Sequence, residues 1–424
     1  MSPAQPVGDP LPGTGELPPQ VAAPAPDGGE RPFSVYLHVP YCRVRCGYCD
    51  FNTYTNLSMG RGASAEDFVG TLAGELRATR RAMDAAGLPV RRAQTVFVGG
   101  GTPTMLPASD LARMLDPVRE CFGLAPDAEV TTEANPDSVD EAGLAVLARG
   151  GFTRVSFGMQ SAVPHVLKVL ERTHEPARVP RVVEWARRTG LSTSLDLIYG
   201  APGESLEDWQ RSLDAVAQIG PDHVSAYALV IEEGTRMWGQ VRRGELPMPE
   251  DDDEATKYEM ADAALGRAGY EWYEISNWAR PGAECRHNRA YWLDWDWWGA
   301  GPGAHSHLGD VRLWNTKHPV AWAGQIAAGR LPVAGHEVID AGSRELERIM
   351  LGIRLREGIA LASLGGASVT SSDDVGATPS HLVPVVAGLV ADELLDAGAA
   401  MRGRAVLTLR GRLMADTVTR ALSQ

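Results

Sequence analysis

The sequence predicts an α/β fold: a partial (β/α)6 barrel, followed by a small C-terminal α+β domain with the character of a winged helix. Six apolar, β-branched runs recur between residues 34 and 230, and amphipathic helical patterns separate them. Such alternation, at roughly 25–40 residues per unit, is typical of a parallel sheet with helical crossovers. Polar or glycine-rich stretches follow the first five runs, as expected where ligands bind beyond the carboxyl ends of the strands.

The predicted strands are short and are separated by helical patterns with recognisable ends. The strands are residues 34–39 (SVYLHV), 95–100 (TVFVGG), 129–134 (EVTTEA), 153–159 (TRVSFGM), 192–200 (STSLDLIYG) and 223–230 (HVSAYALV). A first helix is predicted over residues 64–87, where Ser64 and Asp67 form a capping pair. A later helix starts with the pair Ser205 and Asp208 and ends at Gly220.

Changes in composition divide the chain into four parts. Residues 1–30 hold eight prolines and five glycines and almost no large apolar side chain, which predicts a disordered tail. Residues 31–235 are predicted to form the barrel, and residues 236–340 a tryptophan-rich connecting region. Residues 341–424 are predicted to form the C-terminal domain, in which RAVLTLRGRLMADTVTRAL indicates a short hairpin followed by a helix.

The bulk composition excludes several classes of partner. The formal charge is −14, which argues against binding to nucleic acid or to an anionic membrane surface. No run of about 18 apolar residues predicts a membrane span, and no signal peptide is recognisable. Three of the five cysteines are clustered, which favours metal chemistry in a reducing compartment over a disulfide framework. We therefore expect a cytoplasmic protein.

Three cysteines lie within eight residues, just after the first predicted strand. Cys42, Cys46 and Cys49 would bind three irons of a cubane cluster and leave the fourth iron open for an exogenous ligand. The alternative is a structural zinc site that His38 or Cys285 completes. The spacing favours the iron–sulfur site, because zinc loops more often use two separated CxxC pairs and this chain has no second pair.

Several motifs resemble the anaerobic coproporphyrinogen oxidase family, within the radical S-adenosylmethionine (SAM) superfamily. They are YLHVPYCRVRCGYCDF, FVGGGTPT, TTEANPD, RVSFGMQS, LERTH, DLIYGAPGES and YEISNWARPGAECRHNRAYW. The resemblance runs from about residue 33 to the C-terminus and is closest to the heme-chaperone branch of the family. It implies a radical-SAM barrel with a family-type C-terminal domain, a [4Fe-4S] cluster, and SAM chelating the open iron through its amino and carboxylate groups.

The resemblance also implies roles for individual residues. Cys42, Cys46 and Cys49 would hold the cluster, and Glu133 would bind the ribose or amino group of SAM. The other implied SAM contacts are Tyr36, Tyr48, Gly100, Gly101, Thr102, Gln160, Arg172, Asp196 and Ala228, and the last four correspond to the site of a second SAM in the oxidase. Without the resemblance, a lone charged residue near a strand end is more often a cap or an ion-pair partner.

Phe51 separates the two activities that the resemblance allows. The oxidase branch carries a further cysteine two positions after the third, where this chain has Phe51. A phenyl ring cannot replace a thiol that is needed for chemistry. A heme chaperone is therefore the main prediction, and oxidative decarboxylation of coproporphyrinogen III is the alternative. The expected partners are heme, an unknown heme-acceptor protein and a flavodoxin-type or ferredoxin-type reductant.

Eight of the eleven tryptophans lie between Trp272 and Trp322. Composition alone fits either a packing layer between the barrel and the C-terminal domain or the walls of a heme site. The segment HNRAYW matches the HNxxYW motif that the family associates with heme, and the match implies contacts from His287, Asn288, Tyr291 and Trp292. His287 is the first candidate iron ligand, and Arg286 and Arg289 would meet the propionates.

Overall fold

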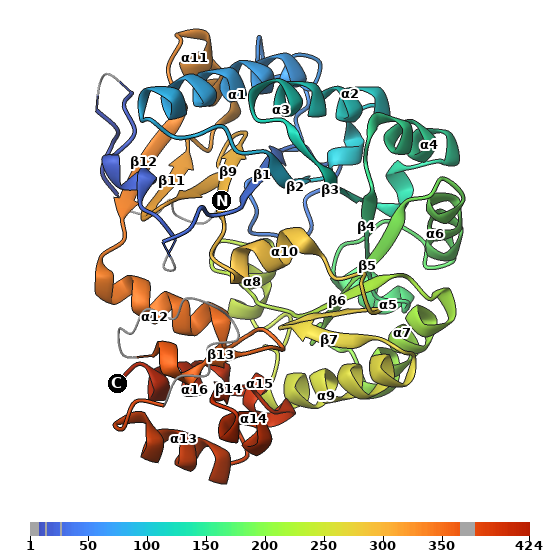
Figure 1. Cartoon of the computed structure of the whole chain (residues 1–424). Coiled ribbons are helices and arrows are strands. Elements are labelled where there is room, and N and C mark those ends of the chain that lie inside the picture. Colours follow the sequence, from blue (N-terminus) through green and yellow to red (C-terminus); the bar gives the residue numbers. More distant parts are fainter. Residues whose placement is uncertain (1–7, 13–14, 26–27, 365–377) are drawn as a thin grey trace.

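The computed structural model describes residues 8–12, 15–25, 28–364 and 378–424. The strands form an open arc, most helices cover the outside of this arc, and a smaller, mainly helical unit near the C-terminus lies beside one end of it (Figure 1). Within the described ranges, no helix is both long enough and apolar enough to cross a membrane.

Six parallel strands form the centre of the sheet, as predicted. They are β1 (Phe33–Val39), β2 (Ala93–Gly100), β3 (Leu124–Ala134), β4 (Arg154–Gln160), β5 (Ser192–Tyr199) and β6 (His223–Ala228). They lie side by side in chain order, and each neighbouring pair is parallel. All six carboxyl ends therefore meet at one rim of the arc, where the polar stretches of the sequence gather.

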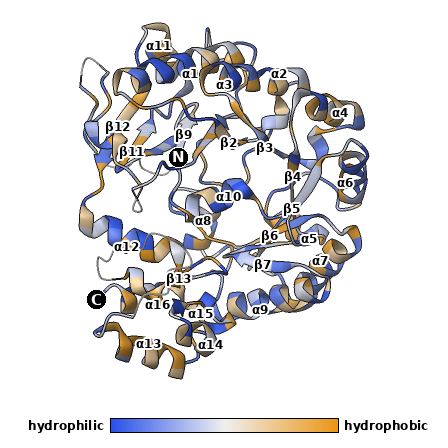
Figure 2. Cartoon of the chain, viewed as in Figure 1, coloured by the Kyte–Doolittle hydropathy of each residue, from blue (hydrophilic) through white to orange (hydrophobic). Residues whose placement is uncertain are grey.

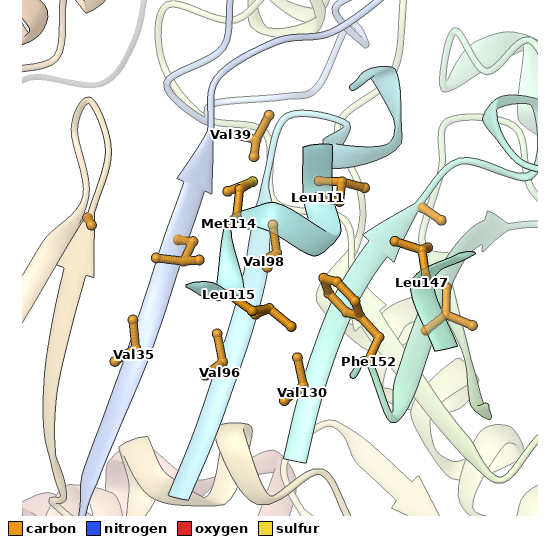
Figure 3. Packing of buried hydrophobic residues seen from close by; sticks show 14 of the residues in the cluster. Val35, Val39, Val96, Val98, Leu111, Met114, Leu115, Val130, Leu147 and Phe152 are labelled. Carbon is orange, nitrogen blue, oxygen red and sulfur yellow. The ribbon is translucent and has the colours of Figure 1, made fainter. Parts of the chain in front are cut away.

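Helices cover the outer face of these strands. They are α1 (Phe68–Ala85), α2 (Ala108–Arg113), α3 (Leu115–Cys121), α4 (Glu141–Gly150), α6 (Arg178–Arg188), α7 (Leu206–Ile219) and α9 (Asp251–Arg267). Two further helices, α5 (Pro164–Val169) and α8 (Arg236–Arg242), share a separate hydrophobic cluster with residues that follow β5 and β6. Alternate strand residues such as Val96, Val98 and Val130 point to the helix side and pack with Leu115 and Phe152 (Figure 3). The other residues of each strand are left to line the inside of the barrel.

The two predicted helix starts have different outcomes. Helix α7 begins as predicted, because Ser205 and Asp208 form a complete capping box, and it ends at Gly220 in the left-handed conformation. The prediction for α1 was wrong by four residues, since this helix begins at Phe68. The carboxylate of Asp67 instead accepts from the backbone N–H of Gly62 at 2.7 Å and closes a turn in front of the helix.

The tryptophan-rich region extends the sheet at both edges rather than only connecting two domains. Strand β9 (Asp296–Ala300) pairs in parallel with β1, and β10 (His305–Leu308), β11 (Val311–Asn315) and β12 (Val333–Val338) follow in antiparallel order. At the other edge, β8 (Asn277–Ala279) pairs with β6, and β7 (Glu271–Glu274) pairs with β8. The complete sheet has 12 strands in the described part of the chain.

Several of the clustered tryptophans belong to the core of this extension. Trp298 on β9 and Trp322 on α11 (Pro319–Ala327) are fully buried, and Trp278 on β8 is nearly so. The indole of Trp322 donates to the buried carboxylate of Glu75 on α1 at 2.8 Å. These side chains fit the packing interpretation of the tryptophan cluster, although they pack within the extended sheet and not against the C-terminal domain.

The C-terminal unit is mainly helical. Its elements are α12 (Ala341–Gly352), β13 (Ile359–Ala360), α13 (Leu382–Ala391), α14 (Ala397–Met401), β14 (Arg404–Ala405), α15 (Leu409–Leu413) and α16 (Ala415–Leu422). They share a hydrophobic cluster of their own. The predicted local hairpin is not formed, because β14 pairs with the distant β13 and residues 409–413 continue as a helix. Residues 365–377 of the predicted domain lie outside the described residues.

The described part of the first 30 residues has a packing role that its composition did not suggest. Val21 and Leu17 are buried in the main core cluster, and Asp9 pairs with His336 on β12 through backbone hydrogen bonds of 2.8 and 2.9 Å. Two well-placed apolar side chains therefore attach a segment that is otherwise rich in proline and glycine. The remaining positions, 1–7, 13–14 and 26–27, lie outside the described residues.

Candidate functional site

The cysteine loop follows β1 and is fixed at its base. The backbone N–H of Cys42 donates to the carbonyl of Tyr54 at 2.9 Å, and that of Tyr54 donates to Pro40 at 2.7 Å. At the tip, the carbonyl of Gly47 accepts from the N–H of Met237 on α8 at 2.9 Å. Hydrogen bonds at both its base and its tip thus fix the conformation of the loop that carries Cys42, Cys46 and Cys49.

The glycine loop after β2 packs directly against the cysteine loop. A Cβ atom on Gly101 would lie 2.5 Å from the carbonyl oxygen of Tyr41 and 2.9 Å from Cys42 Sγ, so only glycine fits there. Gly100 has a φ of +111° and donates its N–H to the carboxylate of Glu133 at 3.0 Å. The glycines predicted from the sequence therefore bring the ends of β1, β2 and β3 into contact.

A cavity of about 520 Å³ opens between these loops, and we call it the cluster cavity. The three clustered cysteines line it, together with eight of the ten predicted SAM residues: Tyr48, Gly100, Gly101, Thr102, Glu133, Gln160, Arg172 and Asp196. The other two, Tyr36 and Ala228, line a neighbouring cavity. The structure therefore gathers residues from the ends of five strands around the three thiols.

The thiols of the cysteine loop must lose their protons when they bind iron. Burial raises the pKa of the Cys42 thiol to about 11, and burial also raises the pKa of Cys49. Without metal both thiols stay protonated at neutral pH, so iron binding must release protons. Three thiols that share one cavity, with no fourth cysteine on the loop, match a cubane in which each thiolate binds a different iron.

The two candidate fourth ligands of a zinc site are engaged elsewhere. His38 contacts the hydroxyl of Tyr36 and the carbonyl of Asn52 through its two ring nitrogens, each at 3.0 Å. The thiol of Cys285 donates to Glu129 at 3.5 Å. In the described ranges, no three His, Cys, Asp or Glu side chains are grouped closely enough to hold a single metal ion. His38 and Cys285, which could complete a zinc site, are thus both held by other partners.

Arg172 is a cation from outside the cysteine loop that contacts one of its thiols. Its guanidinium donates to Cys46 Sγ at 3.6 Å, to the side-chain oxygen of Asn135 at 2.9 Å and to the carbonyl of Gly158 at 3.0 Å. These hydrogen bonds hold the positive charge of Arg172 beside the cysteines that would bind the cluster. Asn135 follows β3 in the TTEANPD motif, and it is a positioning residue that the sequence reasoning did not single out.

Two buried carboxyl groups face the inside of the barrel. Burial, with a further contribution from the neighbouring Asp196, raises the pKa of Glu133 to about 8. Burial also raises the pKa of Asp196, although the hydroxyl of Ser156 donates to both of its oxygens at 2.9 and 3.0 Å. An incoming cationic group would favour the ionised forms, which is the chemistry expected where the sulfonium and amino groups of SAM bind.

A second cavity of about 470 Å³ lies inside the barrel, and we call it the barrel cavity. It shares Tyr48, Cys49, Phe51, Glu133, Ser156, Gln160 and Asp196 with the cluster cavity, so the two cavities adjoin. Three of the four predicted heme contacts line it: His287, Asn288 and Tyr291. The fourth, Trp292, does not line it, and this side chain interacts with the carboxyl of Glu274 instead.

Helix α10 (Arg286–Trp292) carries these predicted heme residues. It lies inside the arc although its composition is hydrophilic (Figures 1 and 2). Glu129 on β3 caps its start by accepting from the backbone N–H groups of Arg286 and His287, each at 3.0 Å. The sequence reasoning missed Glu129, whose only local signal was its place at the start of a predicted strand.

Both ring nitrogens of His287 have partners. Nδ1 lies 2.7 Å from the hydroxyl of Thr95, and Nε2 lies 2.9 Å from the hydroxyl of Tyr291. Since the Thr95 hydroxyl donates to Ser34, Nδ1 carries the ring proton and Nε2 accepts from Tyr291. Burial lowers the pKa of His287 to about 3, so the ring is neutral. Iron could bind Nε2 only after the Tyr291 hydroxyl moves aside.

The remaining candidates of this region have structural roles. His307 donates to the carbonyl of Gly309 at 2.8 Å and is buried. Arg286 pairs with Asp127 at 3.1 Å, and Arg289 pairs with Glu357. Both arginines, which the sequence suggested for the propionates, are therefore already neutralised by partners, and neither lines the barrel cavity.

Residues 36–216 match the sequence profile of the Radical SAM superfamily. The chain is 50% identical over 399 residues to the heme chaperone HemW of Mycobacterium tuberculosis, covering 94% of this chain and 96% of the relative. It is 37% identical to the heme chaperone HemW of Escherichia coli, covering 68% and 75%. Among solved structures, it resembles coproporphyrinogen III oxidase (HemN) from Escherichia coli, with a TM-score of 0.77, 23% identity and coverage of 96% and 92%.

The oxidase structure shares the fold, and at this identity it supports the fold alone. The Mycobacterium tuberculosis relative matches almost the full length of the chain at 50% identity, and the motifs of this chain that resemble the family lie on the rim and on the helix described above. The family implied by the cysteine loop, the glycine loop and the HNRAYW segment is therefore confirmed. The chain belongs to the HemW family of the radical SAM superfamily.

Proposed function

We propose that this protein is a cytoplasmic heme chaperone, which binds heme in the barrel cavity and transfers it to an acceptor protein. The observation that supports this function best is the barrel cavity itself. It has an apolar rim, three residues of the HNRAYW segment line it, and it adjoins the cavity of the three thiols. A flat, largely apolar macrocycle with a polar edge is the class of ligand that such a space suits.

The cluster cavity would hold a [4Fe-4S] cluster and SAM. Cys42, Cys46 and Cys49 would hold three irons, and a bound cluster supplies one-electron chemistry to the sulfonium of SAM. Glu133 would bind the ribose or amino group of SAM, and the glycine loop, which has no side chains at Gly100 and Gly101, would let SAM approach the cysteine loop closely. A flavodoxin-type or ferredoxin-type protein would supply the electron, and any SAM cleavage would be slow or regulatory.

Phe51 argues against coproporphyrinogen oxidation as the activity. This side chain lines both cavities, at the position where the oxidase branch carries its additional cysteine. Its ring is 58% exposed, so it offers an apolar surface to a ligand at the rim and no group that transfers a proton or an electron.

Anaerobic reconstitution with iron and sulfide tests the proposal. The reconstituted protein is titrated with heme while the Soret band is followed, and separately it is given coproporphyrinogen III with SAM and a reductant. We expect a Soret shift that saturates at one heme per chain and no formation of protoporphyrinogen. Decarboxylation of coproporphyrinogen would overturn the chaperone assignment in favour of the oxidase.

A pair of variants tests the iron ligand. His287→Gln removes the imidazole, and Tyr291→Phe removes the hydroxyl that covers Nε2. If His287 is the ligand, the first change lowers heme affinity at least about tenfold, whereas the second leaves it unchanged or raises it. Equal affinity in wild type and His287→Gln would show that another group binds the iron. Iron and sulfide contents should stay unchanged in both variants.

A further inference from the structure

Arg154 is a buried cation on the floor of the barrel cavity. It is the first residue of β4, it is 4% exposed, and it lines the cavity. One terminal nitrogen, Nη1, donates to the carbonyl of Ala283 at 3.0 Å. The other, Nη2, has no hydrogen-bond partner, and no carboxylate of the described chain forms an ion pair with this guanidinium.

Thr131 lies directly beside Arg154. The two residues are register partners on the neighbouring parallel strands β3 and β4, and both line the barrel cavity. The hydroxyl of Thr131 is also buried without a hydrogen-bond partner. Two unpartnered donors next to each other are uncommon in a protein interior, where most buried polar groups are paired. Together they indicate a place that a ligand acceptor group completes.

The lining of the barrel cavity differs between its polar floor and its apolar rim. Strand β4 rises about 20 Å from Arg154 to Gln160 at roughly 3.3 Å per residue, so Arg154 lies far below the rim. At the rim, the exposed side chains of Phe51, Tyr227 and Val230 line the opening. A ligand that fills this space must have an apolar body and an acceptor group at its inner edge.

A carboxylate is the acceptor that fits the floor best. The guanidinium of Arg154 and the hydroxyl of Thr131 each have an unused donor, and two such donors can bind the two oxygens of one carboxylate. A carboxylate at the edge of a flat apolar molecule therefore matches the donors of the floor while the apolar body meets the rim.

We propose that Arg154 and Thr131 form a carboxylate subsite that receives one propionate of the heme, so that the macrocycle enters the barrel propionate edge first. This inference rests on the proposed heme-binding function. It names the binding partner of a propionate, a role that the sequence had suggested for Arg286 and Arg289. Those two arginines pair with carboxylates of the protein and do not line the cavity. Arg154, in contrast, lines the cavity and has no such ion pair in the described part of the chain.

The test compares heme with heme dimethyl ester, whose propionates carry no charge. Both are titrated into the full-length protein, reconstituted anaerobically, and the ratio of the two dissociation constants is measured. We expect wild type to prefer heme by about 10-fold to 100-fold. Arg154→Met should remove this preference by weakening heme and leaving the ester unchanged, and Thr131→Val should reduce the preference in part.

Two further variants separate binding from folding. Arg178→Met is the control, because Arg178 donates to the backbone carbonyls of Pro136 and Val139, as Arg154 does to that of Ala283, but lies outside the barrel cavity. It should keep the preference for heme. Arg154→Lys keeps the charge and should retain part of the preference. If Arg154→Met fails to fold, Arg154→Lys and Thr131→Val still report on the subsite through the same ratio.

The outcomes distinguish this inference from the proposed function. If wild type binds neither heme nor its ester, the chaperone function itself fails. If heme binds but Arg154→Met and Thr131→Val keep the wild-type ratio, the subsite is wrong and the function stands. Equilibrium dialysis with SAM adds a second check, because a loss of SAM binding in Arg154→Met with an unchanged ratio would assign the floor to the carboxylate of SAM and overturn the proposal.

Discussion

The guanidinium of Arg172 donates to Cys46 Sγ at 3.6 Å and to Asn135 at 2.9 Å, which joins the segment after α5 to the cysteine loop. A fixed positive charge next to a cluster ligand stabilises the reduced, more negative form of the cluster. Arg172 is therefore expected to set the reduction potential as well as to line the cluster cavity.

Replacing Arg172 by Met should make the reduction potential of the reconstituted cluster more negative, by roughly 50–100 mV for the loss of one nearby charge. Arg172→Lys should lose less, because the charge remains. Redox titration followed by electron paramagnetic resonance measures the shift, and Arg178→Met serves as the control. Equal potentials in wild type and Arg172→Met would show that the guanidinium has only a structural role.

Each clustered cysteine should be required for iron binding. Changing Cys42, Cys46 or Cys49 to Ala removes one of three thiolates, so iron and acid-labile sulfide after reconstitution should fall to near background. Cys121→Ala is the control, because this thiol is buried at the end of α3 and lines neither cavity. Full iron content in any single variant of the loop would contradict the proposed ligand set.

The six strands and their rim could be predicted because the relevant signals are local. Apolar alternation defines each strand, and the polar stretch that follows it marks the ligand side. The start of α1 was misplaced because the Ser64 and Asp67 pattern is also satisfied by a turn. The pairing of β9 with β1 could not be predicted, since it joins segments more than 250 residues apart and leaves no local pattern.

The alternation of residues in β4 indicates which side chains face the barrel cavity, but not which hydrogen bonds Arg154 makes. In β4, Arg154, Ser156 and Gln160 line the barrel cavity, whereas Val155, Phe157 and Met159 are buried in the core. The alternation was visible in the sequence. The sequence could not show that Ala283 accepts from Nη1 of Arg154 while Nη2 has no partner beside Thr131. These contacts join segments that are distant in the chain.

Phe51 should contribute to heme binding from the rim of the barrel cavity. The exposed ring is free to pack on the macrocycle, and Phe51→Ser should weaken heme binding by about 3-fold to 10-fold, the range expected for one aromatic contact. Val90→Ser is the matched control, since Val90 is 64% exposed and lines neither cavity. Identical heme affinities in the two variants would exclude Phe51 as a contact.

His287 should make stability depend on pH in a defined direction. Burial lowers its pKa to about 3 in the folded protein, compared with the ordinary value of 6.5 in the unfolded chain. Between these values the unfolded chain binds the proton and the folded protein does not, so lowering the pH favours unfolding. The stability linked to the neutral ring is complete above pH 6.5 and is lost progressively as the pH falls toward 3.

Relative to His287→Gln, which does not titrate, wild type should lose about 2 kcal/mol between pH 7 and pH 5. Urea unfolding of both proteins at the two pH values measures this difference, and the comparison cancels the titration of the other buried groups. A difference that stays constant with pH would mean that His287 has the same pKa in the folded protein and in the unfolded chain, which its burial and its two hydrogen bonds to Thr95 and Tyr291 argue against.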